Sequence, residues 1–254
     1  MLIYYYRNAD RLDIETLDNL VNAMPQQQRD IVEHYKTYRQ RCEQAIAYAM
    51  LCHALQHGQN QINGIQTTIK QFPLCDLRLP YAEYPLWAFG EHGKPYLTSH
   101  EGVFFNISHC KEAVALAVSD REVGVDVEGR RRFSDNLLER SFNDEEQHAV
   151  KHSQDPEMEF AKIWTRKEAW FKYTGTGILI EHLKTVEDDA AAAECAISTF
   201  PVIAINEGDS TFPVIAINEG DSASPATDKG DSASPATDKG DSTFWLSIAE
   251  KRRK

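Results

Sequence analysis

The residues best suited to chemistry stand in two short stretches, the first of which surrounds Glu168. Trp164, Glu168 and Lys172 are spaced four residues apart, which places them on one face of a helix. A carboxylate and an ammonium group held side by side on a rigid element suit a site that handles a metal ion and a phosphate. The same spacing is typical of a Glu–Lys pair on an exposed helix surface, and this stretch by itself favours that simpler interpretation.

The second stretch is Val123–Glu128, where the alternation of apolar and acidic residues predicts a half-buried strand with Asp126 and Glu128 on one face. Two neighbouring carboxylates repel each other unless a cation or a basic group lies between them. With Glu168 they would supply three oxygen ligands, as in the magnesium sites that a protein shares with a substrate phosphate. The alternative is a solvated acidic strand face, with the valines directed into the core.

A helix and a strand must hold these side chains in place. The helix is predicted to begin at Asp155 or Pro156 and to end at Gly175, because glycine adopts the left-handed conformation that stops a helix. Trp164 is expected to be structural and to pack the helix onto the neighbouring sheet, whereas Arg166 is expected to tolerate alanine. Consecutive antiparallel strands are predicted at 104–107, 113–118 and 123–127, and helices at 13–24 and 25–54.

Two further motifs lie upstream, Gly93-Lys94-Pro95 and Phe105-Asn106-Ile107-Ser108-His109. Together with the two stretches above, in this order and spacing, they resemble the 4′-phosphopantetheinyl transferases of the large, surfactin-synthetase-activating type. The resemblance covers about a third of the chain, up to Gly177. Cys110 departs from the serine that commonly follows the histidine in that family.

The resemblance implies a magnesium-dependent transfer of 4′-phosphopantetheine from coenzyme A to a serine of an apo acyl or peptidyl carrier protein. Asp126, Glu128 and Glu168 would hold Mg²⁺, and Lys172 would bind the diphosphate. Glu168 would also accept the serine proton, either directly or through a metal-bound water. Which carrier protein is served is left open.

The resemblance also implies contacts with the rest of coenzyme A. Lys94 and His109 would bind its phosphates, and Arg39 and Arg41 are candidates for its nucleotide end. Each has a plainer alternative: Lys94 as a turn residue, and the two arginines as solvated side chains on an exposed helix. A family glutamate near the metal corresponds to Glu146, which is three residues after Asn143 and is therefore predicted rather to form a capping box.

The fold that the resemblance implies is α+β, with two pseudo-symmetric halves at 1–110 and 111–254. Each half would be a small antiparallel sheet packed against a long helix, coenzyme A would lie in the cleft between them, and the protein would act as a monomer. The second half would carry the metal site. Pattern alone predicts only a helix-rich first half and a strand-rich second half.

Composition narrows the class of protein. The formal net charge of −12 argues against a nucleic-acid-binding protein. Five cysteines, an odd number without metal-type spacing, predict reduced thiols and a cytoplasmic protein. The N-terminus predicts a first strand rather than a signal peptide, and no apolar run reaches the ~20 residues that span a bilayer.

The C-terminal part of the chain repeats itself. Residues 198–209 recur unchanged at 210–221, and residues 222–231 recur unchanged at 232–241. Perfect copies indicate a recent tandem duplication or an error in the recorded sequence rather than a solenoid. A low-complexity insert is therefore predicted at about 206–241, one apolar copy is predicted to be a strand, and a closing strand is predicted at 243–249.

Two other functions fit the same residues. A different magnesium-dependent nucleotide- or phosphate-transfer enzyme would use the same carboxylates. A non-catalytic protein that binds carrier domains would share the fold, although the intact acids and lysines argue against it.

Overall fold

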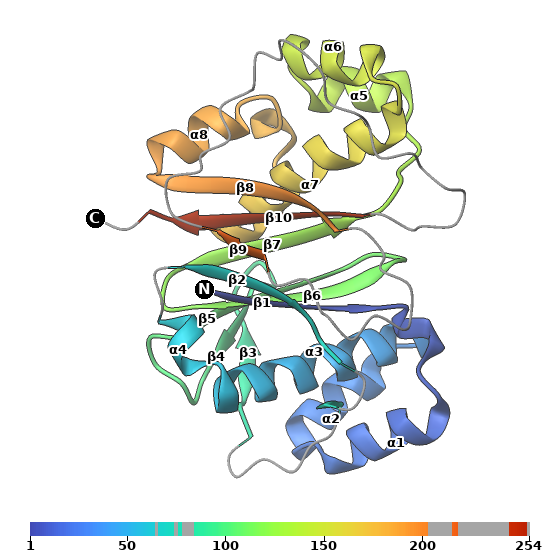
Figure 1. Cartoon of the computed structure of the whole chain (residues 1–254), viewed down its shortest axis with the longest axis vertical. Helices are drawn as coiled ribbons and strands as arrows, with labels where there is room; N and C mark the ends of the chain where they lie inside the picture. The colour runs from blue at the N-terminus through green and yellow to red at the C-terminus, as the bar shows by residue number, and fades with distance from the viewer. Residues whose placement is uncertain (64–65, 74–75, 78–83, 203–214, 218–243, 253–254) are drawn as a thin grey trace.

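The computed structural model describes residues 1–63, 66–73, 76–77, 84–202, 215–217 and 244–252. The helices and the two larger sheets form four layers (Figure 1). The five-stranded and three-stranded sheets lie next to each other, with the helices of the first half outside the five-stranded sheet and those of the second half outside the three-stranded sheet. The α+β class expected from the sequence is confirmed.

The described elements of the first half are β1 (Leu2–Arg7), η1 (Ala9–Arg11), α1 (Ile14–Ala23), α2 (Gln26–His34), α3 (Tyr38–His57), α4 (Gln59–Ile62), β2 (Thr67–Gln71), β3 (Trp87–Phe89), β4 (Pro95–Leu97), β5 (Phe104–His109) and β6 (Ala113–Ser119). Those of the second half are β7 (Val123–Glu128), α5 (Asp135–Ser141), α6 (Asp144–His152), α7 (Pro156–Thr174), η3 (Ile180–His182), α8 (Val186–Ala192), β8 (Cys195–Val202), β9 (Ile215–Ile217) and β10 (Phe244–Lys251).

The larger sheet has the strand order β5-β6-β1-β2-β9, in which β1 and β2 run parallel and the other neighbours antiparallel. The smaller sheet has the order β7-β10-β8 and is antiparallel throughout. β3 and β4 form a separate hairpin. Because β6 belongs to the larger sheet, that sheet extends to Ser119, beyond the predicted division at 110–111.

Two predicted elements differ in the structure. The predicted helix at 25–54 is two helices, because Tyr35 is extended and Thr37 begins α3 by accepting a hydrogen bond from the backbone N–H of Gln40. The predicted run of three paired strands stops after β5 and β6, since β7 pairs with β10 in the other sheet.

Three apolar clusters hold the layers together. The first lies between α3 and the larger sheet, the second lies between the two sheets and includes Ile3 and Val125, and the third surrounds α7. The middle of α3 is enclosed, with consecutive buried residues from Ala45 to Cys52. The long helix of each half therefore packs on the outer face of its own sheet (Figure 1).

The duplicated segment contributes to both sheets. Phe200–Val202, from the first apolar copy, ends β8, and Ile215–Ile217, from the second copy, pairs with β2 as the edge strand β9. Both copies thus supply strand residues, where one was expected. Most of the predicted low-complexity insert at 206–241 lies outside the described residues.

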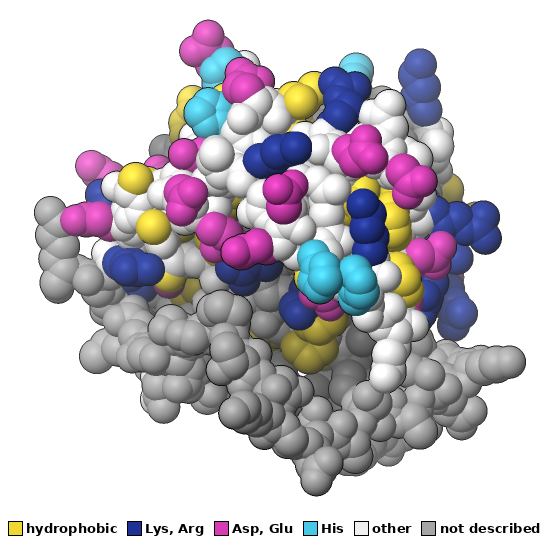
Figure 2. Space-filling view, turned by 90° about the horizontal axis from the view of Figure 1, so that it is seen from above, with side chains coloured by type: hydrophobic (Ala, Val, Ile, Leu, Met, Phe, Trp, Pro, Cys, Tyr) yellow, Lys and Arg dark blue, Asp and Glu magenta, His cyan; other side chains and the backbone are white. Residues whose placement is uncertain are grey.

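The surface of the second half carries both signs of charge. Figure 2 shows acidic side chains interspersed with lysines and arginines on the face seen from above. Among the described residues, no helix combines the length and apolar character that crossing a membrane requires.

Candidate active site

The helix that organises the site is α7, and its ends are those predicted. Asp155 caps its N-terminus by accepting a hydrogen bond from the backbone of Met158, and Pro156 opens the first turn. Gly175 ends it in the left-handed conformation, with φ of 71°. The buried face of α7 lies on β7 and β10.

Close contact between α7 and β7 depends on Gly124. A Cβ atom at this position would lie 2.2 Å from the carbonyl oxygen of Ala169 and 2.3 Å from the backbone nitrogen of Tyr173. Both atoms belong to the backbone of α7, so a larger residue would push the helix off the strand. Glycine here lets β7 bring Asp126 up against the helix.

Asp126 is enclosed rather than solvated, since only 2% of its surface is exposed. Its Oδ1 atom accepts hydrogen bonds from the Ser108 hydroxyl at 2.8 Å and from the Lys172 ammonium group at 2.6 Å. Its Oδ2 atom accepts one from the Thr165 hydroxyl at 2.7 Å. This burial excludes the solvated strand face, and Lys172 pairs with Asp126 across the two elements instead of forming a simple surface pair with Glu168.

Strand β5 reaches the same point through its polar side chains. Asn106 Oδ1 accepts a hydrogen bond from the backbone N–H of Val125 at 3.0 Å, and Ser108 Oγ accepts one from that of Val127 at 3.2 Å. Ser108 also accepts a hydrogen bond from Lys172 at 2.7 Å. These side chains join the two sheets where β5 and β7 have no ladder of backbone hydrogen bonds.

Glu168 lies on the same helix face as Lys172 and accepts a hydrogen bond from the indole N–H of Trp164. Burial, together with the negative charge of Asp126, raises the pKa of Glu168 to about 7, although Lys172 opposes the shift. Burial also raises the pKa of Glu128. The Arg131 guanidinium, which donates to Glu128 Oε2 at 2.5 Å, opposes this shift. Asp126, Glu128 and Glu168 thus border the same partly desolvated space.

That space is a cavity of about 390 Å³ between the two halves. It is lined by Ile107, Ser108, His109, Asp126, Val127, Glu128, Arg131, Glu168 and Lys172. The structure therefore brings together five of the residues singled out in the sequence: His109, Asp126, Glu128, Glu168 and Lys172. Ser108, Thr165 and Arg131 were not assigned to the site, although all three stand inside or next to the motifs.

His109 is connected to the first half through Glu43, a buried carboxylate on α3. Glu43 lies 3.4 Å from His109 Nδ1 and 2.6 Å from Arg39 Nε. Arg39 also donates to the carbonyl oxygen of Cys110 at 2.6 Å. Of the two candidate arginines, Arg39 is therefore beside the site, whereas Arg41 is exposed and donates to the carbonyl oxygen of Tyr35.

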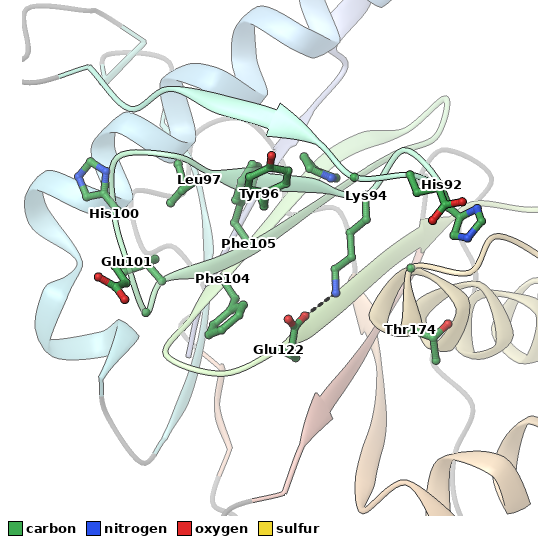
Figure 3. A pocket seen from close by; sticks show the side chains of 16 residues that line it. His92, Lys94, Tyr96, Leu97, His100, Glu101, Phe104, Phe105, Glu122 and Thr174 are labelled. Carbon is green, nitrogen blue, oxygen red and sulfur yellow. Dashed lines mark hydrogen bonds and ion pairs between the residues drawn. The ribbon is translucent and has the colours of Figure 1, made fainter.

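Lys94 borders the next part of the cleft instead of the cavity with the carboxylates. Its ammonium group pairs with Glu122 at 2.6 Å (Figure 3). It also donates to the carbonyl oxygen of Tyr173 at 2.7 Å. It lines a pocket of about 280 Å³ that also contains Glu168 and Lys172, and a larger one of about 460 Å³ whose walls include Tyr96 and Phe104. Its present partners are protein groups, so a phosphate would have to compete with them.

Glu146 has the capping role expected for it. Its side chain accepts from the backbone N–H of Asn143, and the Asn143 side chain accepts from that of Glu146. Its other carboxylate oxygen binds the Lys167 ammonium group at 2.7 Å. Both oxygens are thus occupied by the protein.

The remaining helix residues have structural partners. Trp164 is buried and stacks on Phe142, at the end of α5, and on Phe160 of α7 itself, so it is structural as predicted. Arg166 pairs with Glu187 at 2.8 Å and donates to Thr199. It points away from the cavity, as the sequence predicted, although its contacts are more extensive than those of a free surface residue.

Parts of the chain are similar in sequence to known proteins. Residues 122–207 match the profile of the 4′-phosphopantetheinyl transferase superfamily. The chain is 32% identical over 122 residues to the 4′-phosphopantetheinyl transferase AcpT of Salmonella typhimurium, covering 45% of this chain and 64% of the relative. It is 32% identical over 116 residues to the 4′-phosphopantetheinyl transferase gsp of Aneurinibacillus migulanus, covering 44% and 47%. It is 29% identical over 125 residues to the 4′-phosphopantetheinyl transferase ffp of Bacillus subtilis, covering 44% and 56%.

The aligned part of the chain spans less than two thirds of the length of each of these relatives. The profile match at 122–207 includes β7 and α7, which carry Asp126, Glu128, Glu168 and Lys172. The region at 122–207 is the part of the chain that is similar to the 4′-phosphopantetheinyl transferase superfamily.

Proposed function

We propose that this chain, through its 4′-phosphopantetheinyl transferase region, transfers 4′-phosphopantetheine from coenzyme A to a serine hydroxyl of an apo acyl or peptidyl carrier protein. The observation that carries the proposal is the cavity in which Asp126, Glu128 and Glu168 meet Lys172 and His109. Acids and bases from both halves converge there, as a reaction at a diphosphate requires.

The three carboxylates fit Mg²⁺ in donor chemistry, because hard oxygen ligands are those it prefers. The raised pKa values of Glu128 and Glu168 mark a place where added positive charge would be favourable. Among the described residues, however, no three acidic, histidine or cysteine side chains converge as a complete metal site. Asp126, Glu128 and Glu168 would therefore hold the ion together with the oxygens of the diphosphate, whose charge the ion would neutralise.

Each residue has a role in the transfer. Lys172, already fixed by Asp126 and Ser108, holds an oxygen of the diphosphate, and His109 binds a further phosphate at the edge of the cavity. Glu168 accepts the proton of the serine hydroxyl. The serine oxygen forms a bond to the phosphorus next to pantetheine, and the bond from that phosphorus to the bridging oxygen breaks, which releases 3′,5′-adenosine bisphosphate.

The chain acts as a monomer, because both halves of the cleft come from one chain. The four cysteines among the described residues are unpaired, which suits the cytoplasm, where we place the reaction.

Mass spectrometry tests the function directly. A panel of apo carrier proteins is incubated with the chain, coenzyme A and Mg²⁺, and a carrier should gain the mass of one phosphopantetheine group. Asp126→Ala should abolish the gain, whereas Glu139→Ala, at an exposed position on α5, should leave it unchanged. No gain on any carrier that a known transferase modifies would refute the function, and modification from a nucleotide donor in place of coenzyme A would favour another phosphate-transfer enzyme.

A further inference from the structure

Thr165 stands next to the proposed active site, and the reaction as written gives it no part. It lies in the middle of α7, is fully buried, and donates its hydroxyl hydrogen to Asp126 Oδ2 at 2.7 Å. A threonine inside a helix ordinarily bonds to a carbonyl of the preceding turn. Because a hydroxyl has one hydrogen to donate, the one on Thr165 is committed to the strand opposite.

Thr165 lies on the same side of α7 as the proposed active-site residues. Thr165 precedes Glu168 by three residues and Lys172 by seven, so all three share one side of the helix over two turns. Lys172 holds Oδ1 of Asp126 and Thr165 holds Oδ2. The carboxylate is therefore gripped at both oxygens by the helix that carries Glu168, and it cannot rotate without breaking one of the two contacts.

Counting lone pairs identifies the oxygen left for a ligand. A carboxylate offers about four acceptor positions. Among the described residues, Ser108 and Lys172 occupy both positions on Oδ1, and Thr165 occupies one on Oδ2. The remaining position is on Oδ2, the atom that Thr165 holds.

We infer that Thr165 is a positioning residue, whose hydroxyl fixes the orientation of the Asp126 carboxylate, which would hold Mg²⁺ together with Glu168. This inference rests on the proposed function, and specifically on the magnesium site within it. Groups that orient a metal ligand are commonly worth about 10–100-fold in metal affinity. Thr165→Val keeps the shape of the side chain and removes the hydrogen bond, so it should weaken magnesium binding with little change in the packing.

The test is a calorimetric titration of Mg²⁺ into the full chain with coenzyme A present, alongside the magnesium dependence of transfer. Thr165→Val should raise the magnesium dissociation constant about tenfold or more, and Thr165→Ser, which keeps the hydroxyl, should restore it to within about twofold. Thr16→Val is the matched control, because Thr16 also donates to an aspartate, Asp13, at 2.7 Å, but in an exposed turn of α1. It should behave as the wild type.

Several results would overturn the inference. If Thr165→Val has the same magnesium dissociation constant as the wild type, the hydroxyl has no positioning role. If Thr165→Val does not fold, Thr165→Cys replaces it, and a constant no weaker for cysteine than for serine would contradict the inference equally. If the wild-type chain transfers phosphopantetheine but Thr165→Val leaves magnesium binding unchanged, only the inference about Thr165 is wrong. If the wild-type chain binds neither magnesium nor coenzyme A, the proposed function is wrong as well.

Discussion

The ion pair between Lys167 and Glu146 allows a quantitative test of how α7 is held. Lys167 precedes the proposed base Glu168 and is only 2% exposed. Its ammonium group lies 2.7 Å from Glu146 Oε1 and 2.5 Å from the carbonyl oxygen of Leu183, beside the ring of Phe142. It therefore ties α7 to α6 and to the segment after η3.

Removing one member of a buried pair costs about 3–5 kcal/mol, because the other charge is left without a partner. Lys167→Met removes three contacts and should fall in this range. Glu146→Gln keeps an oxygen that can accept the Asn143 N–H, and the lysine it leaves behind can release its proton, so its cost should be lower, at about 2 kcal/mol. With both changes no charge is stranded, so the double variant should lose about 2 kcal/mol less than the sum.

The pH dependence has a definite sign. Burial lowers the pKa of Lys167 below its ordinary value of 10.5, and Glu146 opposes that shift. Between the folded pKa and 10.5, the unfolded chain binds the additional proton, so this group makes the folded state more stable as pH rises through that window. In Glu146→Gln the pKa should fall further, and the window should widen.

Urea denaturation followed by circular dichroism measures these free energies of unfolding from pH 7 to pH 10. Glu145→Gln, exposed in the same first turn of α6, is the control and should change stability by less than about 0.5 kcal/mol. A Lys167→Met variant as stable as the wild type would show that the buried ion pair does not hold α7, and so would free-energy changes that are simply additive in the double variant.

Three further predictions concern the same framework. Gly124→Ala should destabilise the fold by about 3 kcal/mol, because its Cβ would meet the backbone of Tyr173, and an unchanged melting temperature would contradict that close contact. Trp164→Ala should lower the free energy of unfolding by about 3–5 kcal/mol in urea denaturation, because its ring is buried. A loss below about 1 kcal/mol would show that the ring is not part of the core. Lys172→Met should destabilise by about 3 kcal/mol, since Asp126 would lose its counter-charge, and should weaken coenzyme A binding in calorimetry; wild-type values for both would refute the pairing.

The spacing of a few residues was enough to predict much of the site. The interval between Glu168 and Lys172 gave their common helix face, and alternation around Asp126 gave a strand. Both patterns are local, and local periodicity survives folding because the backbone geometry of each element is fixed. The resemblance added the order of the motifs and hence the expectation that they meet.

Contacts across elements were beyond the reach of the sequence. Ser108 and Thr165 are ordinary polar residues by type, and only the packing of β5, β7 and α7 makes them partners of Asp126. Glu43 looks like an i,i+4 partner of Arg39, and nothing local indicates that it also faces His109. The predicted pairing of β7 was wrong for the same reason, because its partner β10 lies more than a hundred residues later in the chain.

Charge in the cavity argues that the metal ion and the donor bind together. Counted as ionised, Asp126, Glu128 and Glu168 exceed Lys172 and Arg131 by one negative charge. A diphosphate adds about two more, which a partly desolvated cavity would resist strongly. A divalent cation brings the sum back to about one negative charge, close to the value without either ligand. Each ligand therefore lowers the electrostatic cost of the other, so their affinities should be coupled by the same factor in both directions.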